Sequence, residues 1–280
     1  MFKYSLRVIR YILVILITAI SLPTSSFGAT LTLGGTGAAL GSMKQLAVAF
    51  NKHFPAASID VRPSVGSSGG IRAVTEGMLD IGISSRALKD EELTSAIKVW
   101  AYAKSPFVLA VHHKLSVANL TTQQAIGIYD GSLLQWTDGT TVRVILRSPT
   151  ETDTVILKQF IPGMEAALAT AYQRRGPPIA TTDQDIADKI QSIPGAVGTS
   201  TLSLILGENR PLKALALNNV APTVENMGNG TYPMSKTLYL VTRAQAKAEV
   251  QQFIDFMQSE EGAAILKRTG HLMLDSSKAK

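Results

Sequence analysis

The chain has 280 residues, 45% of them hydrophobic, a formal net charge of +6 and no cysteine. The lack of cysteine excludes disulfide bonds, thiolate zinc sites and a lipid-modified N-terminal cysteine. Its four histidines are too scattered for a recognisable metal motif, and no long Lys/Arg run carries interleaved aromatic residues. We therefore expect no metal site, no cofactor and no nucleic-acid partner.

The first 28 residues have the three-part pattern of an export signal. Lys3, Arg7 and Arg10 precede an apolar run from Tyr11 to Leu22, and a short polar stretch follows up to Gly28. Cleavage there would leave 280 − 28 = 252 residues with a formal charge of +6 − 3 = +3. We expect a periplasmic protein that is not a lipoprotein. A retained N-terminal anchor is the alternative, although the apolar run is short for a membrane span.

The mature chain is predicted to begin with a strand, a tight glycine loop and a helix. The strand covers Leu31 to Leu33, the loop Gly34 to Gly37, and the helix Ala39 to Lys52, where apolar residues recur at helical spacing. A Gly35-x-Gly37 start invites a dinucleotide-binding interpretation. The third glycine of that fingerprint is misplaced, which argues against it.

A second unit of the same kind follows. It has a strand from Ser58 to Arg62, a Gly/Ser loop from Ser64 to Gly70, a helix-like segment to Met78, and a strand from Ile81 to Ile83. The last strand ends on Ser84-Ser85-Arg86. A helix start exposes unpaired N–H groups and a positive dipole end, so this loop favours an anion. A plain turn with N-caps is the alternative.

The middle of the chain continues the alternation of strands and helices. Leu88 to Lys98 is predicted as a helix with a solvated acidic face, and Phe107 to Val111 as an apolar strand. A helix over Gln123 to Tyr129 precedes a strand from Thr141 to Leu146. That strand ends on Arg147, whose planar fork of donors suits a tetrahedral oxyanion. A surface ion pair is the alternative for this arginine.

The last third is predicted to hold the remaining core elements. These are a helix from Thr182 to Ile193, a short strand followed by a hydroxyl loop within Ala196 to Thr201, a strand over Leu212 to Leu217, a loop from Asn218 to Tyr232, a strand over Thr237 to Thr242, and helices over Glu249 to Met257 and from Ser259 to Arg268. The alternation predicts two α/β lobes, with Phe107–Val111 and Thr237–Thr242 crossing between them. We place lobe 1 at residues 29–108 plus 234–280 and lobe 2 at residues 109–233.

Several motifs, taken in order, resemble the PstS-like phosphate-binding periplasmic proteins of ABC transporters. They are V-G-S-S-G-G-I, D-I-G-I-S-S-R-A-L-x-D-E-E, Arg147 with T-x-T, G-A-V-G-T, L-N-x-V-A-P-T and Y-P-M-S-K. The resemblance covers most of the mature chain. It implies a two-lobed type II periplasmic binding protein fold with hinge strands and an interlobe cleft that holds phosphate or a related oxyanion. It also implies a non-enzymatic, monomeric protein that serves an inner-membrane ABC permease.

The resemblance also suggests ligand-binding positions in this chain. From the first lobe these are Thr36 and Gly37, then Ser67, Ser68 and Gly69, then Ser84 and Ser85; from the second they are Arg147, Thr152 and Thr154, with Arg86 and Asp153 as possible additions.

Two positions depart from the family pattern. The resemblance implies an acid where Ser85 stands, and a site without an acceptor for the ligand's O–H distinguishes phosphate from sulfate poorly. Asp153 stands where the resemblance implies a glycine, and it could take over the acceptor role or repel the anion.

Two rival functions stay open. One is an envelope anion-binding or sensor protein without a transport role. The other is an exported phosphatase that uses Ser67, Ser68 or Ser84, but a nucleophilic serine needs a base and none of these loops contains a histidine.

Overall fold

The computed structural model describes residues 29–274. Its strands are β1 (Ala29–Gly35), β2 (Ala57–Val61), β3 (Ile81–Ser84), β4 (Ile97–His112), β5 (Asn119–Leu120), β6 (Arg143–Val144), β7 (Leu146–Arg147), β8 (Ile179–Ala180), β9 (Ala196–Thr201), β10 (Leu212–Ala214), β11 (Ala216–Leu217), β12 (Ser235–Arg243) and β13 (Leu272–Met273). Its helices are α2 (Gly37–His53), α3 (Gly66–Thr75), a 3-10 turn (Asp90–Glu92), α4 (Thr122–Asp130), α5 (Thr152–Phe160), α6 (Met164–Gln173), α7 (Asp183–Ser192), α8 (Leu202–Gly207), α9 (Val224–Gly228), α10 (Ala248–Gln258) and α11 (Glu260–Arg268).

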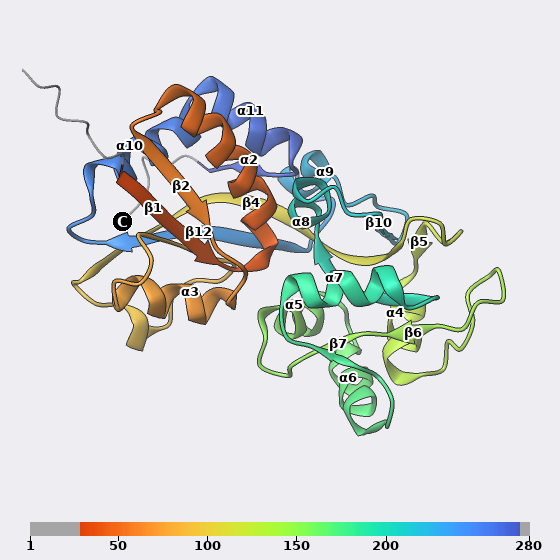
Figure 1. Ribbon diagram of the computed structural model, residues 1–280. Helices are drawn as coiled ribbons and strands as arrows, with labels where there is room; N and C mark the ends of the chain where they lie inside the picture. Colours follow the sequence, from red (N-terminus) through yellow and green to blue (C-terminus); the bar gives the residue numbers. More distant parts are fainter. Residues whose placement is uncertain (1–28, 275–280) are drawn as a thin grey trace, which may run out of the picture.

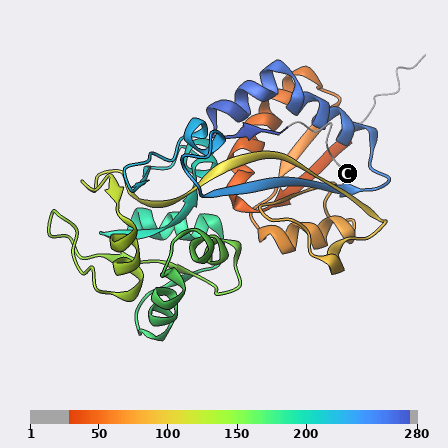
Figure 2. The ribbon, with the colours of Figure 1, turned by 180° about the vertical axis from the view of Figure 1, so that it is seen from behind.

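One continuous sheet runs through the molecule in the order β2-β1-β3-β12-β4-β9-β6. Strands β1, β2 and β3 are parallel, whereas β12 runs antiparallel to both β3 and β4. Figures 1 and 2 show two bodies on either side of a narrow middle, with β4 and β12 lying side by side across it. The predicted two-lobed α/β fold is therefore confirmed.

The first lobe is a sheet covered on both faces. Helices α2, α10 and α11 lie on one face and α3 on the other (Figure 1). The first face buries a large apolar cluster that includes Leu33, Phe50 and Phe253, and the α3 face buries a smaller one around Val74 and Val241. Both faces of these strands are therefore apolar, as expected for parallel strands between helix layers.

The second lobe has its own cores. Helices α4, α5 and α6 pack around Phe107, Tyr129 and Leu168, while α7 packs against β9 over Val108 and Ile186. Each lobe thus buries apolar side chains of its own, and the two lobes depend on β4 and β12 for their connection. The boundaries that we predicted at residues 108 and 234 remain predictions.

The crossing point is marked by a proline. Strand β4 pairs with β12 up to Pro106 and with β9 from Phe107 onward. Proline has no N–H group to donate to a ladder, so it suits the position where a strand changes partner. The hydroxyl of Tyr232, just before β12, donates to the carbonyl oxygen of Phe107 at 2.8 Å. This bond ties the two crossing segments together.

The sequence predictions were wrong in several places. Leu88–Lys98 forms only the short 3-10 turn Asp90–Glu92, and at Ile97 the chain starts β4 by pairing with β12. Helix α3 begins at Gly66, so most of the predicted Gly/Ser loop is its first turns.

Three further differences concern the second lobe. The predicted strand from Thr141 to Leu146 is divided into β6 and β7, because the chain leaves β9 after Val144 to pair with β8. The hydroxyl loop predicted at the end of Ala196–Thr201 is part of the strand β9, and the predicted loop from Asn218 to Tyr232 contains α9. The predicted export signal lies outside the described residues. No helix within residues 29–274 has the length and apolar character needed to cross a bilayer.

A buried histidine should make the stability depend on pH. Burial lowers the pKa of His271 to about 4, and its ring is 1% exposed beside the ring of Tyr102. The unfolded chain, with a histidine pKa of about 6.5, binds more protons between these values, so stability falls as pH drops from about 6.5 to 4.

The difference between the folded and unfolded pKa values of His271 corresponds to roughly 3 kcal/mol of unfolding free energy. Urea unfolding at several pH values should show this fall, and His271→Gln should reduce it. The exposed Leu134 gives a control, because Leu134→Gln changes no titratable group and should leave the pH dependence unchanged. An equal pH dependence in wild type and His271→Gln would contradict the assignment.

Candidate ligand-binding site

A polar cluster lies where the two lobes meet, at the ends of the crossing strands. We call it the junction cluster. The first lobe contributes Thr36, Ser67 and Ser85, the second contributes Arg147, Asp153, Asp183 and Thr199, and β12 contributes Lys236.

The first lobe presents a row of hydroxyl groups. Thr36 is the N-cap of α2, and its Oγ1 lies 3.1 Å from Ser85 Oγ. Ser67, in the first turn of α3, accepts from the Ser85 N–H at 3.0 Å, and its Oγ lies 3.3 Å from Ser85 Oγ. A hydroxyl can rotate to donate or accept, so this row can face a ligand oxygen without a large rearrangement.

The hydroxyl row lies at the N-termini of two helices, α2 and α3. Neither α2 nor α3 has an acidic residue in its first turn. In the second lobe the opposite holds, because α5 carries Asp153 and α7 carries Asp183 and Asp185 in the first turn. A helix N-terminus favours negative charge. In the second lobe the aspartates of α5 and α7 provide this charge, whereas the N-termini of α2 and α3 in the first lobe have no acidic side chain.

A buried lysine joins the two second-lobe acids. Lys236 Nζ lies 2.5 Å from Asp153 Oδ1 and 3.3 Å from Asp183 Oδ1, and the lysine side chain is 1% exposed. Burial alone would lower the pKa of Lys236, but attraction to Asp153 and Asp183 outweighs it and raises the pKa. The Lys236 ammonium group also lies 5.5 Å from the ring centre of Phe107. This lysine is therefore charged at neutral pH.

The two acids differ in what they bind. The second oxygen of Asp153 accepts from Thr199 Oγ1 of β9 at 2.6 Å. The second oxygen of Asp183 instead reaches across the junction and lies 3.2 Å from Thr36 Oγ1. Burial would raise the pKa of Asp183, but Lys236 and Arg147 together lower it. Asp183 is thus an ionised carboxylate that contacts the hydroxyl row.

Arg147 ends β7 and is 7% exposed. One terminal nitrogen donates to the Ala180 carbonyl oxygen at 3.3 Å, and the other lies 3.4 Å from Glu151. Its Nε atom is buried without a hydrogen-bond partner. An unpaired buried donor is costly, so this guanidinium has capacity left for an acceptor such as an oxyanion.

Of the predicted site residues, the structure brings Thr36, Ser67, Ser85, Arg147 and Asp153 into the junction cluster. Gly37 lies beside it as the first residue of α2, and its carbonyl oxygen accepts from Gln184 Nε2 at 3.0 Å. Asp153 sits in the cluster, where its oxygens contact Lys236 and Thr199, and its role as an acceptor remains a prediction.

The other predicted residues lie around the cluster. Ser84 closes a turn through bonds with Arg86 backbone atoms, and Thr154 donates to the Ser148 carbonyl oxygen. Ser68 is exposed and accepts from Arg86, which also forms a two-point ion pair with Glu92. Gly69 lies within α3, and Thr152 is the half-buried first residue of α5. These six residues have no contact with the cluster among the bonds described.

Sequence reasoning missed Asp183, Lys236 and Thr199 as members of the cluster. Signals for them were present, since Asp183 opens the helix predicted from Thr182 and Lys236 ends the Y-P-M-S-K motif. A charged residue inside an apolar strand is rarely buried unless it is paired. Lys236 next to the apolar strand from Thr237 could have been recognised on that basis.

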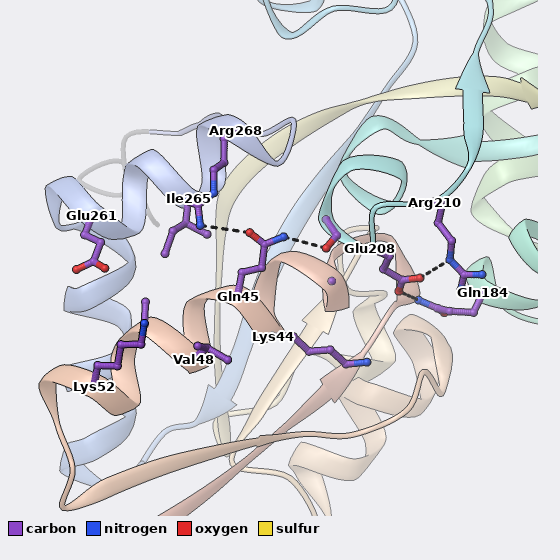
Figure 3. A pocket seen from close by; sticks show the side chains of 13 residues that line it. Lys44, Gln45, Val48, Lys52, Gln184, Glu208, Arg210, Glu261, Ile265 and Arg268 are labelled. Atoms are coloured by element: carbon purple, nitrogen blue, oxygen red, sulfur yellow. Dashed lines mark hydrogen bonds and ion pairs between the residues drawn. The ribbon is translucent and has the colours of Figure 1, made fainter. Parts of the chain in front are cut away.

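The contact between lobes continues behind the cluster to a surface pocket of about 720 Å³. Figure 3 shows Gln184 and Glu208 reaching it from the second-lobe segments, and Gln45 from α2. Gln184 donates to Glu208 at 2.8 Å, and Gln45 donates to the Gly207 carbonyl oxygen at 2.9 Å. Neighbouring residues of α7 thus face two sides, Asp183 the cluster and Gln184 the pocket.

Comparison with known proteins places this architecture in a family. The family model described as the PBP superfamily domain matches residues 23–261. The chain therefore belongs to the PBP superfamily.

Two phosphate-binding proteins are similar to this chain over most of its length. The phosphate-binding protein PstS of Borreliella burgdorferi is 25% identical over 219 residues, covering 74% of this chain and 77% of that protein. The protein of the same name from Bacillus subtilis is 23% identical over 238 residues, covering 83% of this chain and 76% of its own length.

Among solved structures, a similar one comes from Clostridium perfringens and is described as a phosphate ABC transporter substrate-binding protein with bound phosphate. It superposes with a TM-score of 0.73 at 25% identity and covers 88% of this chain and 100% of that chain.

The buried charges generate a stability prediction. Lys236→Met removes the only cation that contacts both carboxylates among the ion pairs described, and leaves Asp153 and Asp183 buried with less compensation. Removing one partner of a buried ionic group costs about 3–5 kcal/mol. Urea unfolding measures the loss.

The control is Lys98→Met. Lys98 is an exposed lysine on β4, the strand that pairs with β12. Its replacement should change the unfolding free energy by no more than about 0.5 kcal/mol. Equal effects of the two substitutions would show that Lys236 does not hold the acids in place.

Proposed function

We propose that the protein is an exported solute-binding protein that holds phosphate, or a related small oxyanion, between its two lobes. It would deliver this ligand to an inner-membrane ABC permease. The named relatives are phosphate-binding proteins, and the structural relative from Clostridium perfringens was solved with phosphate, which supports this assignment.

The observation that carries the proposal is that both lobes contribute donor groups to one junction cluster. The first lobe offers the hydroxyl row Thr36, Ser85 and Ser67 at two helix starts without acids. The second lobe offers Arg147 with a buried Nε that has no partner. Amide and hydroxyl donors together with a guanidinium are the groups that bind tetrahedral oxyanions in proteins.

Capture would follow from a hinge motion at the crossing strands. In an open state the hydroxyl row and the starts of α2 and α3 would bind the anion first. Closure about the segments near Pro106 and Ser235 would then bring Arg147 onto it. The bonds that already join the lobes, such as that from Gln184 to the Gly37 carbonyl oxygen, would re-form in the closed complex.

The arrangement favours binding over hydrolysis. A nucleophilic serine needs a base within hydrogen-bond distance. The histidines contact other groups: His53 pairs with Glu261, His113 contacts the Pro211 carbonyl oxygen, and His271 contacts Leu266 and Thr269. His112 stacks on His113 at the end of β4, within the second lobe. Ser67 and Ser85 are hydrogen-bonded to one another rather than to a base.

Calorimetric titration with phosphate tests the proposal. Phosphate should bind with a measurable heat, and Arg147→Met should weaken the affinity by about 100-fold or more, because hydrogen bonds to charged groups contribute up to about 3 kcal/mol.

Arg143→Met is the matched control, since Arg143 lies exposed on the neighbouring strand β6 and donates to the Pro194 carbonyl oxygen. It should change the affinity by less than about twofold. The absence of heat with phosphate, sulfate and molybdate in folded protein would refute the proposed function.

A further inference from the structure

We propose that Asp183 is the hydrogen-bond acceptor for the ligand's O–H group, and that its position on the lobe opposite the hydroxyl row makes lobe closure the step that selects a protonated oxyanion. This inference rests on the proposed function. It assigns anion specificity to a residue of the second lobe.

Asp183 occupies the one position from which a carboxylate reaches both donor sets of the junction cluster. Its Oδ2 lies 3.2 Å from Thr36 Oγ1 in the first lobe, and its Oδ1 lies 3.3 Å from Lys236 Nζ. The residue is 6% exposed. Asp183 Oδ2 thus lies beside a hydroxyl group to which the oxyanion is proposed to bind.

The neighbouring acid makes no such contact with the first-lobe hydroxyl row. Asp153 is 2% exposed, and its two oxygens contact Lys236 of the crossing strand β12 and Thr199 of β9. Asp183 also contacts Lys236 through one oxygen, but its other oxygen lies against Thr36 of the first lobe. Of the two acids, Asp183 is therefore the one that meets the hydroxyl row.

An ionised carboxylate can accept a hydrogen bond but cannot donate one. Monohydrogen and dihydrogen phosphate carry an O–H group that can pair with Asp183. Sulfate and molybdate carry none at neutral pH, so they would place an unprotonated oxygen against a buried negative charge. Sites built to pair with a ligand's hydroxyl reject analogues that lack it by about 10⁴ to 10⁵-fold.

The hydroxyl row of the first lobe cannot make this distinction by itself. Thr36, Ser67 and Ser85 are neutral groups that can donate to any oxyanion, protonated or not. Asp183 stands at the start of α7, next to Gln184, which also crosses to the first lobe. Phosphate and sulfate should therefore both bind to the open first lobe. Only an anion that carries an O–H group should allow Asp183 to close onto it.

The experiment combines calorimetry with small-angle X-ray scattering on the full mature chain. Wild type should bind phosphate at least about 10³-fold more tightly than sulfate, and only phosphate should reduce its radius of gyration. Asp183→Asn replaces an obligate acceptor with an amide that can also donate. It should strengthen sulfate binding and weaken phosphate binding, each by about tenfold or more, and sulfate should then close the lobes.

Two control variants come from the same helix. Asp185→Asn removes an acid from the first turn of α7. Asp185 pairs with Lys189 and accepts from the Thr181 N–H, so the ratio of phosphate to sulfate affinity should stay as in wild type. Gln184→Ala removes a different bond between lobes and should change both affinities by the same factor. Thermal melts of all variants establish that they are folded.

The outcomes separate the two proposals. If wild type binds phosphate but Asp183→Asn keeps the wild-type ratio, the role of Asp183 is overturned and the proposed function stands. If Asp185→Asn changes the ratio as much as Asp183→Asn, the effect belongs to the helix dipole and the inference also falls. If wild type binds neither anion, the proposed function and the inference both fail.

Discussion

The structure depends on one buried ammonium group. Lys236 enters the junction between the lobes from a crossing strand and compensates Asp153 and Asp183, which would otherwise be isolated charges in a dry environment. The lysine holds Asp153 within the second lobe and leaves Asp183 turned toward the first. Its placement on β12, next to the hinge, also links the charge balance of the cluster to the strand that must bend when the lobes move.

This arrangement gives the two lobes different chemical roles. The first lobe presents neutral donors and uncompensated helix starts, which attract negative charge without choosing among anions. The second lobe presents Arg147 and Asp183, whose opposite charges stabilise one another, so it offers one group that attracts an anion and one that can accept a hydrogen bond from it. A protein that divides attraction and selection between lobes can discriminate at closure, because both sets of contacts exist only in the closed state.

Much of the fold follows from sequence pattern, and the reasons are visible in particular residues. Helix α2 and strand β12 have periodic apolar positions and clear borders, so their predicted ranges agree with the structure within a few residues. The start of β4 was missed because Ile97 to Ser105 mixes charged, small and aromatic residues, and only its pairing with β12 makes it a strand. Propensity at that position is overridden by tertiary contacts.

Of the junction cluster, the sequence predicted Thr36, Ser67, Ser85, Arg147 and Asp153, and it did not predict Asp183, Lys236 or Thr199. Thr36, Ser67, Ser85 and Arg147 were recognised because each follows a strand or begins a helix, where ligand contacts concentrate in α/β folds. The sequence shows only that the loop at Ser85 has no acidic acceptor of its own. The carboxylate that meets this loop is Asp183, about a hundred residues later, and nothing in the local pattern reports such a distant contact.

A crystal structure of the protein grown with phosphate tests the central claim most directly. The account predicts phosphate between the lobes, with Thr36, Ser67 or Ser85 on one side, Arg147 on the other, and an oxygen of Asp183 within hydrogen-bond distance of a phosphate oxygen. Phosphate density elsewhere, or a junction in which Asp183 still contacts Thr36 and no anion lies beside Arg147, would contradict it.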